Sequence, residues 1–260
     1  MIKRLYLIGI GPGDYKYLTM EAKELIEKLS LFFVPEKGGT KEDLTKMRLE
    51  LLKRIKGERN NYKVIFLPFP ERERGLNYRE KVKLWRKEKA KILKNFLLET
   101  EGKEAGFLIW GDPALYDGHI EIMKEIEKEI PLKWDVIPGL SSFQVLTAKS
   151  KLSLTEVATQ VTFHTPRTLR KLEKIDHPVV VFLDNYETFK KFKDSDGDLQ
   201  MIWGAYVGTP YEIIKKGPLK ELVDEILSIR QELKIKKGYI MEVYILKSKS
   251  NKDNSKKDEN

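Results

Sequence analysis

The sequence predicts an α/β protein of two domains, and three observations support this fold class. Short apolar runs rich in β-branched and aromatic residues alternate with longer amphipathic stretches along the chain. The length, 260 residues, is enough for two domains that each bury a core. The spacing of the apolar runs also changes near residues 148–156. We therefore expect residues 1–150 to form an α/β domain with a mostly parallel sheet, and residues 151–247 to form an α/β domain with a mixed sheet.

The apolar runs are the expected strands, and the stretches between them are the expected helices. The strands cover Arg4–Ile10, Lys63–Leu67, Ala105–Trp110, Trp134–Ile137, Thr159–His164, Val179–Leu183, Met201–Tyr206 and Tyr239–Leu246. The best helix runs from Tyr78 to Leu98, because apolar residues recur there every three or four positions, with Lys89 as the one polar member of the stripe. A second clear helix covers Leu219–Leu233. Residues 248–260 are Lys, Ser, Asn, Asp and Glu, and we expect a disordered tail.

Composition excludes several classes of function. The chain has no cysteine, which excludes a disulfide scaffold, a thiol nucleophile, an iron–sulfur cluster and a cysteine zinc site. The lack of cysteine also favours a cytoplasmic protein. We predict no metal site. The first apolar run is too short for a secretory signal, and no run approaches the roughly 18 apolar residues needed to cross a bilayer. The net charge of +9 indicates either a polyanionic partner or a solvated lysine-rich surface.

A glycine-rich loop, Gly9-Ile10-Gly11-Pro12-Gly13-Asp14, follows the first strand. The G-x-G-x-x-G spacing of a dinucleotide site would require glycine where Asp14 stands, and Pro12 has no amide N–H to offer a pyrophosphate. No G-K-[ST] follows any glycine cluster, so the sequence also excludes a P-loop. The loop is therefore either a structural turn or a ligand site without a phosphate cradle.

Three further Gly/Pro-rich loops follow later strands, at the edge where open α/β sheets bind ligands. They are Trp110–Asp117 (WGDPALYD), Val136–Ser142 (VIPGLSS) and Trp203–Pro210 (WGAYVGTP). Each has a structural alternative, such as an Asp-Pro turn or a serine that caps a helix. Because the four loops are spread over both predicted domains, they predict a cleft between the domains that is lined by backbone.

At these loops the chain resembles the S-adenosylmethionine-dependent tetrapyrrole methyltransferases of the cobalamin pathway. The motifs GIGPGDxxxLT (with Thr19), GDPALYD, IPGLSS and VFLD (Val181–Asp184) stand in the family's order and spacing. The resemblance is strongest to the deacetylating members, which methylate C1 of precorrin-5 with loss of acetate to give precorrin-6A. It rests there on Lys37-Gly38, Asp43-Leu44, Arg48, Pro70-Glu71-Arg72, Tyr78, Trp85 and WGAYVGTPYEII. The family also implies a homodimer.

The resemblance implies that the chain binds S-adenosylmethionine and releases S-adenosylhomocysteine. By position, the cofactor contacts fall on Pro12, Trp110, Gly111, Asp112, Leu115, Ser141, Ser142, Leu183, Ala205 and Gly208. A neutral adenosine and a sulfonium cation require close approach to the backbone and one or two acceptors, and these loops could provide both.

The resemblance also assigns candidate residues to the substrate and to the chemistry. Arginines that could pair with the carboxylate arms of precorrin-5 are Arg48, Arg72, Arg74 and Arg79, although each could instead belong to a solvated basic face. Loss of acetate requires a general base and an oxyanion donor. We expect Asp117 or His119 as the base and Tyr116 as the donor, because they adjoin the WGDP loop.

Two other interpretations stay open. The chain could be a methyltransferase of the same fold that acts on another precorrin, on RNA or on a protein residue, or it could be a non-enzymatic nucleotide or nucleic-acid binding module. The paired Trp-Gly motifs and the lack of a basic platform interleaved with aromatic residues favour a small tetrapyrrole substrate. We therefore expect neither a nucleic-acid nor a membrane partner.

Overall fold

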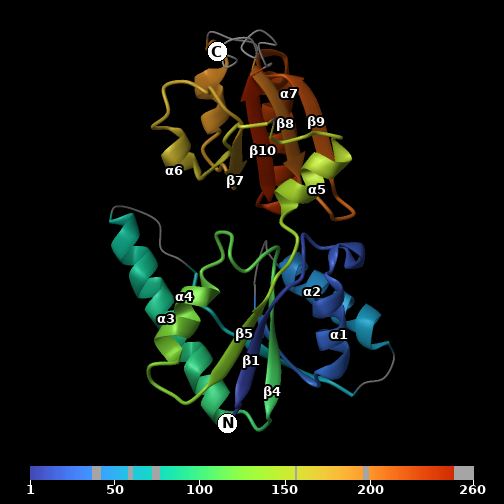
Figure 1. Cartoon of the computed structure of the whole chain (residues 1–260), viewed down its shortest axis with the longest axis vertical. Helices are drawn as coiled ribbons and strands as arrows, with labels where there is room; N and C mark the ends of the chain where they lie inside the picture. The colour runs from blue at the N-terminus through green and yellow to red at the C-terminus, as the bar shows by residue number, and fades with distance from the viewer. Residues whose placement is uncertain (37–41, 58–60, 72–76, 156, 196–198, 249–260) are drawn as a thin grey trace. The chain divides into compact units, whose positions relative to one another are not determined.

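The computed structural model describes residues 1–36, 42–57, 61–71, 77–155, 157–195 and 199–248 (Figure 1). The chain divides into two compact units, Met1–Ser141 and Ser142–Asn260. This division precedes helix α5 (Ser142–Lys149), whereas the change of pattern in the sequence follows it. Except for Ser248, the tail predicted to be disordered lies outside the described residues.

The first unit is built on a parallel sheet of five strands in the order β3-β2-β4-β1-β5. The strands are β1 (Arg4–Gly9), β2 (Leu31–Pro35), β3 (Lys63–Leu67), β4 (Glu104–Ile109) and β5 (Lys133–Ile137). In the register, Gly9 pairs with Ile109 and Ile8 with Ile137, so β1, β4 and β5 end at the same level. The loops that follow these three strands therefore start side by side.

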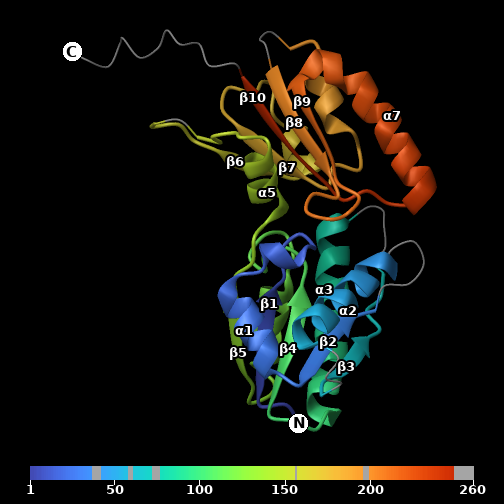
Figure 2. The ribbon, with the colours of Figure 1, turned by 90° about the vertical axis from the view of Figure 1, so that its right-hand side faces the viewer.

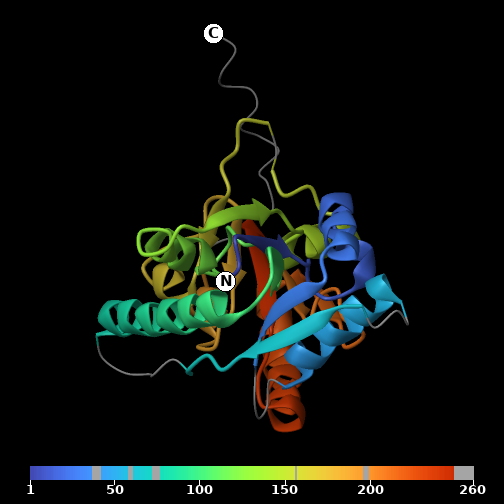
Figure 3. The ribbon, with the colours of Figure 1, turned by 90° about the horizontal axis from the view of Figure 1, so that it is seen from below.

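Helices cover both faces of this sheet (Figures 2 and 3). On one face lie α1 (Met20–Lys28) and α2 (Glu42–Lys56), which pack with Phe32 and Val34 of β2. On the other face lie α3 (Tyr78–Glu99) and α4 (His119–Ile126), which pack with Leu31 and Phe33. Successive residues of β2 thus serve opposite layers, as the pleat of a strand buried on both faces requires.

The second unit contains a mixed sheet in the order β6-β7-β10-β8-β9. Its strands are β6 (Thr162–His164), β7 (Val179–Phe182), β8 (Leu199–Ala205), β9 (Ile213–Pro218) and β10 (Glu242–Ser248). Only the β6–β7 pairing is parallel among the described strands of this sheet. Helix α7 (Leu219–Lys237) packs with the main core of this unit, and α5 packs on β8 and β10. The predicted α/β class, with one parallel and one mixed sheet, is confirmed.

The sequence patterns miss two strands, and the expected strand at Thr159–His164 shortens to β6. Strand β2 is a continuous apolar run, buried at every residue, and such a run cannot be distinguished by its period from the end of a helix. Strand β9, with the sequence IIKKGP, lies at an edge and contains residue types that are rare in strands. Both misses arise because tertiary position outweighs local propensity there.

The two helices expected with most support are present. Helix α3 matches its expected range within one residue, and α7 extends beyond Leu233 to Lys237, where Gly238 ends it in the left-handed conformation. Among the residues that the structure describes, no helix is both long enough and apolar enough to span a membrane.

Candidate functional site

The loops after β1 and β4 are joined by a short antiparallel bridge. Gly11 N donates to Gly111 O (3.2 Å), and Gly111 N donates to Gly11 O (2.9 Å). Both residues have positive φ angles, 69° and 73°, which glycine adopts without steric cost. Two of the loops singled out in the sequence are therefore in direct contact.

Asp112 ties the loop after β5 to the same group. Its carboxylate accepts hydrogen bonds from Gly139 N (3.0 Å) and from Ala114 N (2.8 Å), so it fixes both its own turn and the neighbouring loop. The Thr19 hydroxyl caps α1 by accepting from Ala22 N (3.1 Å), and it also donates to Pro138 O (3.3 Å). The first three sequence motifs thus form one hydrogen-bonded cluster at the carboxyl edge of the sheet.

The glycines in this cluster serve two different purposes. A Cβ on Gly139 would lie 2.8 Å from the carbonyl carbon of Gly9 and still closer to Gly111 O, so the backbones meet only because no side chain intervenes. A Cβ on Gly111, in contrast, would meet nothing within 4 Å. The backbone of Gly111 therefore borders open space, where a ligand can approach it.

The other predicted cofactor residues of the first unit surround this cluster. Pro12 and Ser141 are buried, whereas Trp110 and Leu115 are partly buried. The cluster therefore exposes parts of Trp110 and Leu115 together with backbone groups.

Arg48, a predicted partner of substrate carboxylates, lies inside the first unit. It is 6% exposed, and its guanidinium donates to Leu108 O (3.3 Å) and Leu44 O (2.9 Å) and lies 5.7 Å from the centre of the Trp110 ring. Burial lowers the pKa of Arg48 to about 10, and the charge of Asp117 offsets only part of this. The geometry favours a structural role under Trp110 over a contact with substrate.

Of the remaining substrate candidates, the structure describes Arg79 of α3. Arg79 is exposed in the first turn of the helix. Arg72 and Arg74 lie outside the described residues.

Of the three predicted catalytic residues, Tyr116 and Asp117 lie in the strained turn before α4, and His119 is the first residue of that helix. Tyr116 is half-exposed with a φ of 57°, and Gly118 has a φ of 89°, so Asp117 stands between two left-handed residues. Asp117 Oδ1 accepts hydrogen bonds from His119 N (3.0 Å) and from His119 Nδ1 (2.5 Å). These bonds fix the carboxylate against the first turn of α4.

The His119 ring is buried and has a polar partner at each nitrogen. Its Nε2 lies 2.9 Å from Lys89 Nζ of α3, and its ring lies 4.6 Å from that of Phe107 and 6.0 Å from that of Phe69, centre to centre. Lys89 itself is 4% exposed. Lys89 is a functional candidate that the motifs do not indicate; its only signal in the sequence is that it is the one polar residue in the apolar stripe of α3.

Burial and the neighbouring charges shift the pKa values of both His119 and Asp117. Burial lowers the pKa of His119, the hydrogen bond and charge of Asp117 raise it in part, and the charges of Lys89 and Arg48 lower it further. Burial by itself would raise the pKa of Asp117, but the hydrogen bonds and charge of His119, assisted by Lys89, outweigh it and lower this pKa. A neutral His119 and an ionised Asp117 follow.

In the second unit, Leu183 and Ala205 flank the start of β10. Leu183 N donates to Glu242 O (3.0 Å), and Ala205 pairs with Glu242 across the sheet. Leu183 is 52% exposed, whereas Ala205 is fully buried in the core of the unit. Gly208, with a φ of 83°, donates from its N–H to Glu212 Oε2 (2.8 Å).

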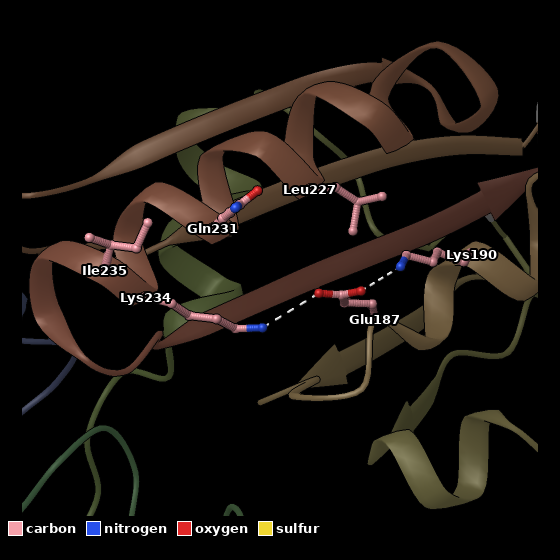
Figure 4. A pocket seen from close by; sticks show the side chains of 6 residues that line it. All are labelled: Glu187, Lys190, Leu227, Gln231, Lys234 and Ile235. Carbon is pink, nitrogen blue, oxygen red and sulfur yellow. Dashed lines mark hydrogen bonds and ion pairs between the residues drawn. The ribbon is translucent and has the colours of Figure 1, made fainter.

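A surface hollow of about 470 Å³ lies elsewhere in the second unit (Figure 4). Its lining residues are Glu187, Lys190, Leu227, Gln231, Lys234 and Ile235. Glu187 lies centrally and forms ion pairs with Lys190 (2.5 Å) and with Lys234 (3.5 Å). These lysines lower the pKa of Glu187, and none of the predicted site residues lines the hollow.

Comparison with known proteins agrees with this arrangement. A precorrin-6A synthase [deacetylating] from Sinorhizobium sp. is 32% identical over 251 residues, 95% of each chain. A cobalt-precorrin-2 C(20)-methyltransferase from Salmonella typhimurium is 25% identical over 154 residues, 58% of each chain. Among solved structures, a cobalamin synthesis related protein (CobF) from Corynebacterium diphtheriae is 25% identical, with a TM-score of 0.78 over 95% of this chain and 99% of that one.

More distant structures share the fold alone. A cobalt precorrin-4 methyltransferase, CbiF, is 19% identical with a TM-score of 0.65 over 94% of each chain.

The family model of the tetrapyrrole (corrin/porphyrin) methylases matches residues 4–223, which include all four loops. The chain therefore belongs to the tetrapyrrole (corrin/porphyrin) methylases, as its motifs predict.

Proposed function

We propose that the chain is a precorrin-6A synthase, which methylates C1 of precorrin-5 with S-adenosylmethionine and releases acetate. The observation that carries this proposal is the similarity to a relative of that name over 95% of both chains. The C(20)-methyltransferase relative matches over only 58% of each chain, which supports the assignment to the deacetylating branch.

The fit of the cofactor rests on the glycine cluster. Backbone that borders open space at Gly111 suits a neutral adenosine, and the Asp112 carboxylate, already held by Gly139 N and Ala114 N, keeps that backbone in place. Further proposed contacts are Pro12, Trp110, Leu115, Ser141, Ser142, Leu183, Ala205 and Gly208. When bound, S-adenosylmethionine supplies an activated methyl group. For that transfer the protein contributes proximity and orientation, since the substrate itself provides the electron-rich carbon.

Release of acetate requires groups that move protons. A base takes a proton from water as the water oxygen bonds to the ketone carbon of the substrate, and a donor stabilises the resulting oxyanion. The carbon–carbon bond then breaks, acetic acid leaves, and the macrocycle carbon that keeps the electron pair is protonated. We propose Asp117 as the base and Tyr116 as the donor, and His119 acts through Asp117 because partners occupy both of its ring nitrogens.

Tyr116 suits the role of a donor. Burial raises the pKa of Tyr116, so its phenol stays protonated at neutral pH. Tyr116 is half-exposed and directly precedes Asp117 in the chain, so one turn carries both a donor and an acceptor. For the carboxylate arms of the substrate, Arg79, Arg72 and Arg74 remain the proposed partners.

The test is a labelled-methyl assay with the purified protein. Methyl-labelled S-adenosylmethionine is offered with precorrin-5, with other precorrins or with bulk RNA, and mass spectrometry counts both methyl incorporation and acetate. One acetate released per methyl transferred to precorrin-5 is the expected result. Methylation of precorrin-5 without acetate, or label that appears only in another precorrin or in RNA, would overturn the proposed activity.

We also propose a homodimer. An aromatic group formed by Phe143, Phe163 and Phe182, with ring centres 5.1 to 6.3 Å apart, reaches the surface at Phe163, which is 41% exposed. Exposed aromatic groups of this kind are typical of interfaces. Light scattering of the eluting protein should give twice 30.4 kDa, and a mass of one chain would contradict the proposal.

A further inference from the structure

We infer that Lys89 is a positioning residue for acetate release: by donating to His119 Nε2 it fixes the tautomer of His119, which in turn holds Asp117 as an oriented carboxylate. The inference rests on the proposed function for its catalytic meaning. The hydrogen-bond chain itself is a property of the protein alone.

The donor properties of lysine set the direction of the hydrogen bonds. An ammonium group has donors and no acceptor, so Lys89 Nζ, 2.9 Å from His119 Nε2, donates to that nitrogen. A nitrogen that accepts carries no proton. The proton of the neutral ring therefore lies on Nδ1, which donates to Asp117 Oδ1 at 2.5 Å.

The surroundings of Lys89 suit a charged ammonium group. Its Nζ lies 4.6 Å from the ring centre of Phe69 and 4.6 Å from that of Trp85, within the range of cation–π attraction. The Trp85 indole donates to Pro70 O (2.7 Å), which fixes one of these rings. Lys89 is therefore held in place by α3 and by its aromatic neighbours.

The chain of hydrogen bonds ends in the strained turn that carries the proposed base and donor. Tyr116 and Gly118, the residues on either side of Asp117, both adopt the left-handed backbone conformation. For Tyr116, which has a Cβ, that conformation costs free energy. The hydrogen bonds from His119 to Asp117 stabilise this turn. A change at Lys89 should therefore reach Asp117 through the His119 ring, without direct contact between Lys89 and the water that reacts.

The first experiment measures the tautomer in the protein without substrate. Long-range ¹H–¹⁵N spectra of the uniformly labelled protein report which nitrogen of each imidazole is protonated, and only three histidines must be assigned, with His119→Gln as the reference for assignment. Near neutral pH we expect Nδ1 of His119 to carry the proton and Nε2 to be a bare acceptor. A His119 protonated at Nε2 would overturn the inference, whatever the activity of the protein.

The second experiment compares Lys89→Met with Lys91→Met, a control at an exposed position two residues further along α3. Methionine keeps the length of the side chain but removes the charge and the donors. We expect the acetate released per methyl transferred to fall about tenfold to a hundredfold in K89M, less than the loss typical for removal of a general base. The methylation rate should change little, and K91M should match the wild type.

A pH profile separates positioning from a general loss of structure. Asp117 is faced by His119, Lys89 and Arg48, and Lys89 lowers its pKa, so the acid limb of acetate release should move to higher pH in K89M. Lys89→Arg retains a charged donor and should restore part of the acetate release. Equal loss of methylation and acetate release in K89M, with an unshifted acid limb, would overturn the inference. If the wild type releases no acetate from precorrin-5, the proposed function fails, while the tautomer measurement still decides the hydrogen-bond chain.

Discussion

Substitution of Gly139 by alanine should destabilise the first unit much more than the same substitution at Gly111. The new Cβ would lie 2.8 Å from the carbonyl carbon of Gly9 and 2.9 Å from its Cα, and these are backbone atoms that cannot rotate away. Overpacking of this kind costs about 1 to 3 kcal/mol. If the loop moves to relieve it, the hydrogen bond from Gly139 N to the Asp112 carboxylate is lost, at about 1.5 to 3 kcal/mol.

If the relief is only partial, both costs apply and sum to about 2.5 to 6 kcal/mol, which lowers the melting temperature by about 8 to 20 °C for a unit of this size. Gly111→Ala is the matched comparison, because its Cβ meets nothing within 4 Å and only its φ of 73° opposes it, at about 1 to 2 kcal/mol. Gly217→Ala, whose Cβ would touch only the Leu222 side chain at 3.7 Å, is the control in the second unit. Calorimetry of the full chain measures all three. Equal melting temperatures for G139A and G111A would contradict the close approach of the Gly9 and Gly139 backbones.

Three further changes test the site. Thr19→Val removes the cap of α1 and the bond to the β5 loop, so urea denaturation should show a loss of about 1 to 2 kcal/mol, and Thr19→Ser should restore it. Tyr116→Phe should change stability by less than about 0.5 kcal/mol yet lower the acetate released per methyl about tenfold or more, and an unchanged ratio would exclude Tyr116 as the donor. Because the folded pKa of His119 lies below its ordinary value of 6.5, the unfolded chain binds the proton first as pH falls. The free energy of unfolding should therefore decrease below about pH 6.5, by at most about 1.4 kcal/mol per pH unit. The variant His119→Gln should show a smaller decrease per pH unit. If the variant and the wild type show the same decrease, His119 is not neutral and buried.

The sequence predicts the parallel first sheet and the mixed second sheet because its apolar runs have the lengths and spacing that these sheets require. It also places the loops after β1, β4 and β5 at one edge, since the carboxyl ends of parallel strands meet there. The contact between Gly11 and Gly111 and the bond from Gly139 N to Asp112 are consequences of that placement. No sequence pattern gives them directly, because they depend on strand register, which only the packed sheet sets.

Burial explains where sequence reasoning about single side chains fell short. Arg48 is a plausible partner for a carboxylate in the sequence, but in the fold two backbone carbonyls accept its hydrogen bonds beneath Trp110. Lys89 stands out in the sequence only as the polar member of an apolar stripe, yet the fold brings it to within 2.9 Å of His119, thirty positions away. A charged side chain changes its role when it is buried, because it then requires nearby polar or aromatic partners, and the sequence does not say which residues those are.

An aspartate follows a left-handed residue in each unit, and in both cases its hydrogen bonds stabilise the strained backbone. In the second unit, Leu183 has a φ of 53°, and Asp184, which follows it, is fully buried. The Asp184 carboxylate accepts from Thr188 N (2.6 Å), Thr188 Oγ1 (2.9 Å) and Tyr244 Oη (2.7 Å), while its carbonyl accepts from Arg230 Nη2 (2.8 Å). Tyr116 is held in the same way by the bonds of Asp117. Because these buried bonds outweigh the strain of about 1 to 2 kcal/mol, each turn can keep one bulky residue, Leu183 or Tyr116, half-exposed in a fixed orientation.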